Sequence, residues 1–372
     1  MISLRNTRTF LFALTIICTA FAADNSGGLR LHGSMYSDLG VVQEYDADDT
    51  DTFKFTGLTN LSLNFRNTNR RYGKIEGLLD LFMPYGVAAD RIFETIPDDA
   101  FPDSSVDEFV TLFSVRGSPL LLDVRNLYFS FYLPFVDITV GRRIINFGKG
   151  SIFSPVDIFS SVDLTDLNYR RSGSDIISLR FPFGLLSGCD IVAGLPLFDD
   201  SYAAAAKLFT TVKGFDFSLV GLYKNAGTSP AKNTQTTAGI AFKGDIEIGA
   251  YGEAVAHYDH DREMLFFEAM AGADYSLRER WIFTAEYMYK DPGYASALRG
   301  QHNAFGSVQY AFNDIMNIST GLIGTIDDRQ AVGIVRYYYN ILQNVDWTVY
   351  IQGVGSNEIA LVNYMTRVEI KF

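Results

Sequence analysis

Apolar and polar residues alternate with a period of two through most of the 372-residue chain. The segment RWIFTAEYMYK (280–290) is a clear example, because Trp281 and Tyr287 share one face and Thr284 and Glu286 share the other. Successive side chains of a β-strand point to opposite faces, so the pattern predicts strands of about ten residues with one apolar and one polar face. No apolar run beyond the first 22 residues is long enough for a transmembrane helix.

Aromatic residues make up 14% of the chain, with 30 Phe and 21 Tyr, yet the alternation spreads them out instead of gathering them in solid blocks. This combination is typical of a membrane β-barrel, in which one face of each strand contacts lipid and the other a polar lumen. A soluble exported sandwich or propeller is the alternative, since alternating strands alone would allow it. Strand length, the asymmetry of the connections and the terminal Phe372 favour the barrel.

The expected strands begin near residues 29, 53, 71, 121, 136, 173, 187, 201, 215, 234, 245, 263, 280, 301, 314, 328, 344 and 362. Short connections alternate with longer polar ones, as in barrels with tight periplasmic turns and long extracellular loops. In lipid every backbone N–H and C=O must pair internally, so the sheet must close. We therefore expect an all-β fold, a closed antiparallel transmembrane β-barrel of about 18 strands. Without the weak hairpin near Gly188 and Tyr202 the number falls to about 16.

Residues 1–22 have the features of a secretory signal peptide. Arg5 and Arg8 precede an apolar run, and the small residues Ala20 and Ala22 form a cleavage signal. We expect residues 23–372 to form the outer-membrane barrel. Without Arg5 and Arg8, 29 of the 31 basic residues remain against 43 acidic ones, a formal charge of −14 that argues against nucleic-acid binding. Cys189 is then the only cysteine, which excludes an intramolecular disulfide.

The most distinctive stretch is DITVGRRIINFGKGSIFSPVDIFSSVD, residues 137–163. Its alternation slips around Arg143–Asn146, which predicts a bulge, with Lys149 at the extracellular end of the strand. The loop that follows is too apolar to extend into water. We expect it to fold into the barrel mouth, pack on the wall and form the constriction.

This stretch resembles the Gly-Arg-Gln-x-Ile-Asn-Trp-Gly-x-Gly…Phe-x-Pro-x-Asp-x-Phe pattern of porin-like outer-membrane proteins, including alginate-export-type and related uncharacterised channels. The matching positions are Gly141, Arg142, Ile145, Asn146, Gly148, Gly150, Phe153, Pro155, Asp157 and Phe159. Arg143 stands where the pattern has Gln, and Phe147 where it has Trp. The resemblance is confined to about twenty residues around this motif. It implies an outer-membrane channel but gives no solute.

Residues in and near this stretch, most of them basic, are the candidates for the pore lining. The candidates are Arg125, Arg142, Arg143, Asn146, Lys149, Asp157, Arg170 and Arg171. One interpretation is a positive constriction that selects anionic or polyhydroxylated solutes. The other is a set of structural ion pairs with lumen carboxylates. A constriction of opposed charges, with a basic wall and an acidic loop, would combine the two.

Other motifs carry little chemistry. The segment HYDHDRE (257–263) has metal-ligating residue types but is expected at a loop tip, where polar residues are ordinary. DADDTD (46–51) lacks the Gly and the closing Glu of a calcium loop. Four His residues show no catalytic arrangement, and no G-x-S-x-G elbow is present. We therefore expect no enzyme activity, no cofactor and no metal site.

The segment 93–113 is the least strand-like part of the chain. It is compatible with a short helix that begins at Asp103 and carries Val106, Phe109 and Val110 on one face. Such a helix would plug the lumen or cover the extracellular rim.

The last segment, LVNYMTRVEIKF, is expected to close the barrel by pairing with the first strand near Leu29–Ser37. Four residues of this segment would share the lipid side: Tyr364, Val368, Ile370 and Phe372. Their spacing resembles the C-terminal signal that the outer-membrane assembly machinery reads.

The sequence thus favours an outer-membrane channel for passive diffusion of small hydrophilic solutes, with anions or carbohydrates as candidates. A structural, assembly or adhesion barrel with a blocked lumen is the alternative, and a transporter of hydrophobic compounds fits the polar inward faces less well. The expected partners are outer-membrane lipids and lipopolysaccharide, the assembly machinery and the solutes themselves. No sequence feature demands a homo-oligomer.

Overall fold

The structure is a computed structural model. It describes residues 29–45, 52–67, 73–89, 109–115, 118–157, 159, 170–194, 202–225, 234–294, 300–327, 330–355 and 360–372. These residues form almost only β-strands: β1(Leu29–Tyr45), β2(Thr52–Asn67), β3(Gly73–Gly86), β4(Phe109–Val115), β5(Ser118–Tyr132), β6(Asp137–Arg143), β7(Ser174–Pro182), β8(Ser187–Gly194), β9(Tyr202–Val212), β10(Phe215–Asn225), β11(Gln235–Asp245), β12(Gly249–Asp259), β13(Met264–Leu277), β14(Trp281–Lys290), β15(His302–Asn313), β16(Met316–Thr325), β17(Gln330–Leu342), β18(Val345–Gly355) and β19(Ala360–Lys371). Within these ranges, no helix has both the length and the apolar character needed to cross a membrane.

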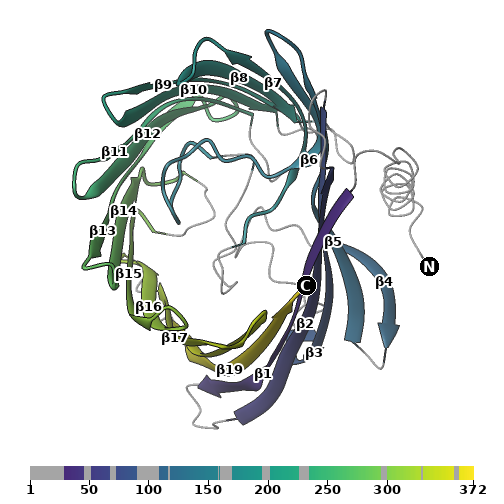
Figure 1. Cartoon of the computed structure of the whole chain (residues 1–372). Coiled ribbons are helices and arrows are strands. Elements are labelled where there is room, and N and C mark those ends of the chain that lie inside the picture. Colours follow the sequence, from purple (N-terminus) through teal and green to yellow (C-terminus); the bar gives the residue numbers. More distant parts are fainter. Residues whose placement is uncertain are drawn as a thin grey trace.

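Eighteen of the strands form a closed antiparallel barrel (Figure 1). Each strand of the ring pairs with its neighbour in sequence, except that β3 pairs with β5, and β19 pairs with β1 to close the sheet. The expected strand starts lie within a few residues of the observed ones. The hairpin near Gly188 and Tyr202 is present as β8 and β9, so the larger of the two expected strand numbers is correct.

The strand β4 corrects the expectation of a helix in this part of the chain. Asp103 and Val106 lie outside the described residues, whereas Phe109 and Val110 belong to β4. β5 continues past the end of β6, which pairs with β5 only as far as Leu127. β4 pairs with the β5 segment 118–123 and satisfies backbone groups that would otherwise form a free edge. Figure 1 shows the β4–β5 hairpin turning away from the ring.

The two faces of the barrel wall differ as the alternation predicts. Leu31, Leu265 and Leu322 are 57%, 52% and 59% exposed on the outer face. Polar residues of the inner face, such as Asn60 and Glu286, are buried instead. Short turns such as 213–214 and 278–280 lie at one end of the barrel, which by the rule for outer-membrane barrels is the periplasmic end.

The barrel closes at the seam between β1 and β19. The ladder runs from Ser34 opposite Lys371 to Tyr45 opposite Ala360, so the pairing includes Ser34–Ser37 of the expected segment and continues along β1 to Tyr45. On its other edge the 17-residue β1 pairs with β2 from Leu29 opposite Asn67 to Glu44 opposite Thr52. The lipid-side residues of β19 and the residue that follows it are exposed on the outer face as expected: Tyr364, Val368, Ile370 and Phe372.

Candidate pore constriction

The loop that follows β6 enters the lumen (Figure 1). β6 ends at Arg143, and the Ile144 N–H then donates to Asn126 Oδ1 at 2.9 Å. The expected bulge is therefore the end of the strand, and Lys149 belongs to the inserted loop instead of the strand's extracellular end. Within β6, Gly141 has a φ of +124°, and a Cβ atom there would lie 2.3 Å from the Leu127 carbonyl oxygen, so this position favours glycine.

One buried carboxylate of the wall, Glu286 on β14, binds the middle of this loop. It accepts backbone N–H groups of Ser151, Ile152 and Phe153 at 2.6, 3.1 and 2.9 Å. The Tyr251 hydroxyl donates to it at 2.8 Å. Glu286 is only 3% exposed and forms no ion pair with a described residue. The loop N–H groups therefore provide the compensation that a buried carboxylate requires.

A second carboxylate, Glu253 on β12, binds both sides of the same turn. Its oxygens accept N–H groups of Gly150 and Val156 at 3.1 and 3.2 Å. They also accept the Lys149 N–H and, at 3.0 Å, the Ser154 hydroxyl. Together Glu253 and Glu286 fix the segment 149–156 against the wall. We call this arrangement the carboxylate clamp.

The apolar side chains of the loop pack on an apolar part of the inner wall. Ile145, Phe147, Val156 and Phe159 join a buried cluster with residues of β7 to β12: Ile176, Val192, Ala205, Val220, Leu222, Ala241 and Val255. Ile152 and Phe153 join a second cluster: Tyr251, Met270, Met288, Phe305 and Ile323. This packing confirms that the loop folds inward, because hydrophobic burial and the clamp act on the same segment.

Two glycines of the motif are explained by this close approach. A Cβ atom at Gly148 would lie 2.7 Å from Glu253 Oε1, and a Cβ atom at Gly150 would lie 1.9 Å from the Phe153 carbonyl oxygen. The glycines therefore let the loop backbone reach the carboxylate clamp.

Most of the basic candidates are in ion pairs. Arg125 and Arg170 approach Asp80 at 3.4 and 3.6 Å, and Arg170 also lies over the Phe82 ring. Arg171 pairs with Asp157, which places an acidic loop residue against a basic one.

The remaining candidates divide into paired and unpaired groups. Arg142 lies 3.7 Å from Asp175, and Lys149 lies 3.5 Å from Asp216. Asn146 Oδ1 accepts the Gly148 N–H and so supports the loop internally. Arg143 forms no ion pair with a described residue, and its guanidinium lies 5.2 Å from the Tyr128 ring centroid.

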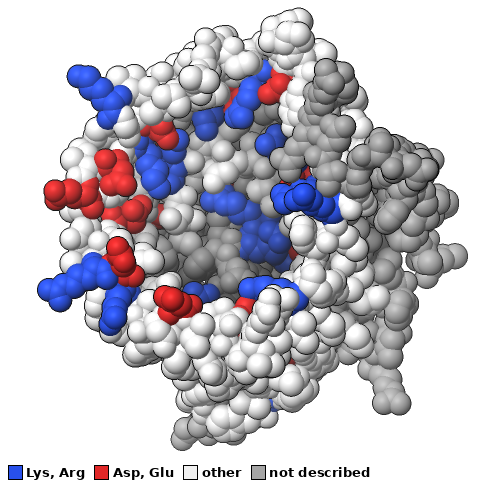
Figure 2. Space-filling view, viewed as in Figure 1, with Lys and Arg blue, Asp and Glu red and all other residues white. Residues whose placement is uncertain are grey.

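A polar pocket of about 240 Å³ lies beside the start of the loop. Four cationic residues line it: Lys74, Arg143, Arg180 and Lys207. Arg180 forms two hydrogen bonds with Asp190, and Lys74 pairs with Glu76. Lys207 donates to the Phe147 carbonyl at 3.0 Å and, like Arg143, has no ion pair within the described ranges. Figure 2 shows Lys and Arg side chains gathered in the hollow centre of the barrel.

Sequence reasoning missed Lys207, although a signal exists. It is the only charged residue of the strand YAAAAKLFTTV and lies on the same face as Ala203 and Ala205, which contact the loop cluster. A single charge on the inward face of an otherwise uncharged strand is a useful marker of a lumen site.

The HYDHDRE segment does not lie wholly at a loop tip. His257 belongs to β12 and is buried between the Thr237 hydroxyl, 2.7 Å from Nδ1, and Glu268, 3.1 Å from Nε2. No group of three or more His, Cys, Asp or Glu side chains suited to a metal ion occurs among the residues with described positions. The residues 1–22 and 46–51 lie outside the described ranges.

No family model matches this sequence, and neither does any curated protein. Several solved structures are nevertheless similar over nearly the whole chain. Acinetobacter baumannii OccAB4 has a TM-score of 0.56 at 8% identity, covering 94% of this chain and 100% of that one. Pseudomonas aeruginosa OccK11 (OpdR) has a TM-score of 0.56 at 10% identity, covering 92% and 96%. Pseudomonas aeruginosa OpdK with vanillate has a TM-score of 0.55 at 9% identity, covering 92% and 99%. The chain therefore has the fold of outer-membrane porins, and the resemblance to alginate-export-type channels stays a prediction.

Proposed function

We propose that this protein is a passive outer-membrane channel for small hydrophilic solutes and that its constriction favours anions. The observation that carries the preference is the pocket beside the loop, where Arg143 and Lys207 have no ion pair with a described carboxylate. Diffusion through the lumen needs no energy source. Selectivity follows from the width left by the loop and from the charge of its surroundings.

The inserted loop sets where selection occurs. The paired cations, such as Arg125 with Asp80 and Arg171 with Asp157, offset each other's charge. Arg143 and Lys207 add positive potential to the lumen, because neither forms an ion pair with a described carboxylate. In a narrow lumen with low-dielectric walls such a potential acts more strongly than it would in open water.

One of the similar solved structures holds a solute of this class. The OpdK structure contains vanillate, which is a small aromatic carboxylate. At 9% identity the likeness transfers the fold only, so the preference for anions depends on the lumen residues of this chain.

The direct test is the reversal potential of the reconstituted protein in a planar bilayer under a KCl gradient. We expect anion selectivity in the wild type and a shift towards cation selectivity in the double variant Arg143→Gln/Lys207→Gln. Lys213→Gln is the control, because it removes a charge from the turn 213–214 outside the pocket. Equal reversal potentials for the wild type and the double variant would refute the preference for anions.

The packing of the loop also favours one alternative, a structural or adhesion barrel whose lumen is blocked. Two buried clusters and the carboxylate clamp hold the loop inside the barrel. Well-folded protein that carries no ion current would support this alternative.

We further propose that residues 1–22 direct export and that Tyr364, Val368, Ile370 and Phe372 form the signal read by the assembly machinery. The exposed apolar outer face supports a location in the outer membrane, in contact with phospholipid and lipopolysaccharide. A variant synthesised without residues 1–22 that still reached the outer-membrane fraction would contradict the role of the leader.

A further inference from the structure

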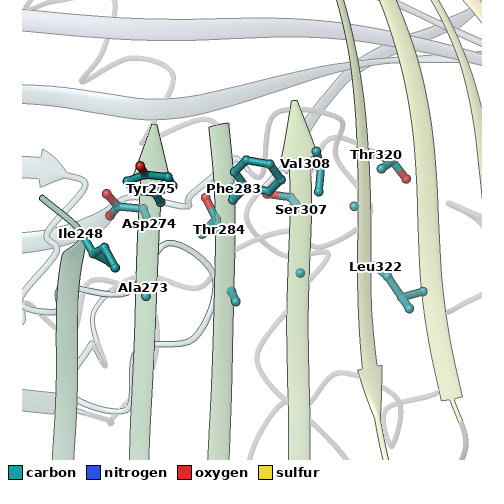
Figure 3. A pocket seen from close by; sticks show the side chains of 13 residues that line it. Ile248, Ala273, Asp274, Tyr275, Phe283, Thr284, Ser307, Val308, Thr320 and Leu322 are labelled. Carbon is teal, nitrogen blue, oxygen red and sulfur yellow. The ribbon is translucent and has the colours of Figure 1, made fainter. Parts of the chain in front are cut away.

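An apolar groove of about 520 Å³ lies on the outer face of the barrel, across β13 to β16 (Figure 3). Two cross-strand rows define it. The row nearer the periplasmic turns consists of Tyr275, Phe283, Val308 and Thr320, and the next row consists of Ala273, Ala285, Gly306 and Leu322. The floor is low because the middle of the second row is made of small residues. A Cβ atom at Gly306 would meet no atom within 4 Å.

The outward orientation of this surface follows from exposure and alternation. Leu322 and Ile248 are 59% and 52% exposed, and Tyr275 is 39% exposed. Asp274, Thr284 and Ser307 belong to the alternate, inward-facing positions, so the hydroxyls of Thr320 and Tyr275 are the only polar side-chain groups of the two outward rows. In a membrane this groove faces acyl chains, not water.

The distance of the groove from the periplasmic turns matches the hydrocarbon thickness of one leaflet. The strand from Arg280 to Ala285 is about 16 Å long, and its rise along the barrel axis is smaller because strands tilt. One leaflet contributes about 15 Å of hydrocarbon. The rings of Trp281 and Tyr310 contact each other between turn and groove, with centroids 4.5 Å apart and planes tilted by 43°, as expected for the aromatic girdle at the interface.

Charges of both signs rim the groove at the level of the headgroups. Arg278 and Arg280 are exposed in the turn joining β13 and β14, and neither guanidinium forms an ion pair with a described residue. Glu279 lies between them, and Asp314 and Glu247 lie in the two flanking periplasmic turns. Cations and carboxylates side by side complement a zwitterionic headgroup better than a purely anionic one.

We propose that the groove binds one zwitterionic diacyl phospholipid of the periplasmic leaflet, such as phosphatidylethanolamine. One acyl chain lies over Ala285 and Gly306, the phosphate lies at Arg278 and Arg280, and the ammonium group lies at the neighbouring carboxylates. This inference goes beyond the proposed function. It requires a membrane-embedded barrel but no conducting pore.

The shape of the groove favours a lipid over a second copy of the chain. Two barrels approach each other with convex walls, and a concave groove would leave a gap between them. A flexible acyl chain adapts to such a groove and gains dispersion contacts along its length.

The test is native mass spectrometry of the full-length protein in detergent, titrated with phosphatidylethanolamine. Wild type should retain one phospholipid. Gly306→Leu fills the groove, and we expect it to lower the occupancy about fivefold or more through lost dispersion contacts. Gly221→Leu is the matched control, because a Cβ atom at Gly221 also meets no atom within 4 Å and Gly221 lies on β10, away from the groove.

The headgroup contacts are tested separately. Arg278→Gln/Arg280→Gln should lower phosphatidylethanolamine occupancy, whereas Lys213→Gln should not. Equal occupancy in wild type and Gly306→Leu would overturn the proposal. A wild-type oligomer that Gly306→Leu dissociates would overturn it too, because the groove would then be a protein interface. Channel conductance should be the same in Gly306→Leu and wild type, so this test is independent of the proposed pore.

Discussion

Asp38 on the first strand and Arg367 on the last strand form two hydrogen bonds of 2.7 Å each across the seam that closes the barrel. Both side chains are nearly fully buried, and the Arg367 guanidinium lies 3.9 Å from the Tyr36 ring centroid. The pair therefore joins the two ends of the sheet from inside the lumen.

Removing one partner of this pair should destabilise the barrel. In Asp38→Asn, Arg367 keeps its charge in a buried site without its carboxylate, which costs about 3–5 kcal/mol in comparable cases. Urea unfolding followed by heat-modifiable gel mobility measures the change. Breaking the exposed pair of Lys54 and Glu44 by Lys54→Gln should change stability by less than about 1 kcal/mol. Equal stabilities for Asp38→Asn and wild type would show that the seam pair contributes little.

Weakening the carboxylate clamp should widen the pore. Glu286→Gln turns one acceptor oxygen into an N–H donor that faces the loop N–H groups of Ser151, Ile152 and Phe153. Each lost acceptor costs about 1–3 kcal/mol, so the loop should leave the wall part of the time. Single-channel recordings should show larger or fluctuating conductance. The exposed Glu279→Gln is the control, and steady wild-type conductance in Glu286→Gln would argue against the clamp.

A side chain at Gly150 should displace the loop from the clamp. In Gly150→Ala the Cβ atom would lie 1.9 Å from the Phe153 carbonyl oxygen, so the backbone must shift at a cost of about 1–3 kcal/mol. We expect increased proteolytic cleavage within 144–157 in the folded barrel. Gly221→Ala, where space is open, should leave the cleavage pattern unchanged.

Deleting Phe372 should reduce assembly. The Phe372 backbone exchanges two hydrogen bonds of 2.8 Å with Gly33, and its ring is 59% exposed on the lipid side. The yield of heat-modifiable barrel in the outer-membrane fraction should fall severalfold. Phe312→Ala, which removes a comparable exposed ring elsewhere, should have a smaller effect. An undiminished yield without Phe372 would refute its role in assembly.

The barrel was predictable because the alternation of apolar and polar residues and the alternation of short and long connections are properties of the local sequence. The inward loop was predictable because Ile152 and Phe153 are too apolar for an extracellular loop. The clamp was not predictable, since Glu253 and Glu286 are about a hundred or more residues from their loop partners and look like any lumen carboxylates. The strand β4 was missed because its pairing depends on how far β5 runs past β6.

The same limit applies to the candidate lumen residues. Sequence reasoning identified Arg142 and Arg171 as basic, but only the register of β6 and β7 and the path of the loop show that Asp175 and Asp157 face them. Whether a charge is paired depends on tertiary contacts, and these decide whether it contributes to selectivity.

The measurement that tests the account most directly is single-channel conductance of the wild-type protein in planar bilayers. The proposed channel requires that the loop leave part of the lumen open, so folded, heat-modifiable protein should insert and carry a stepwise ion current. Repeated insertion of folded protein without any ion current would contradict the channel and leave a barrel with a blocked lumen.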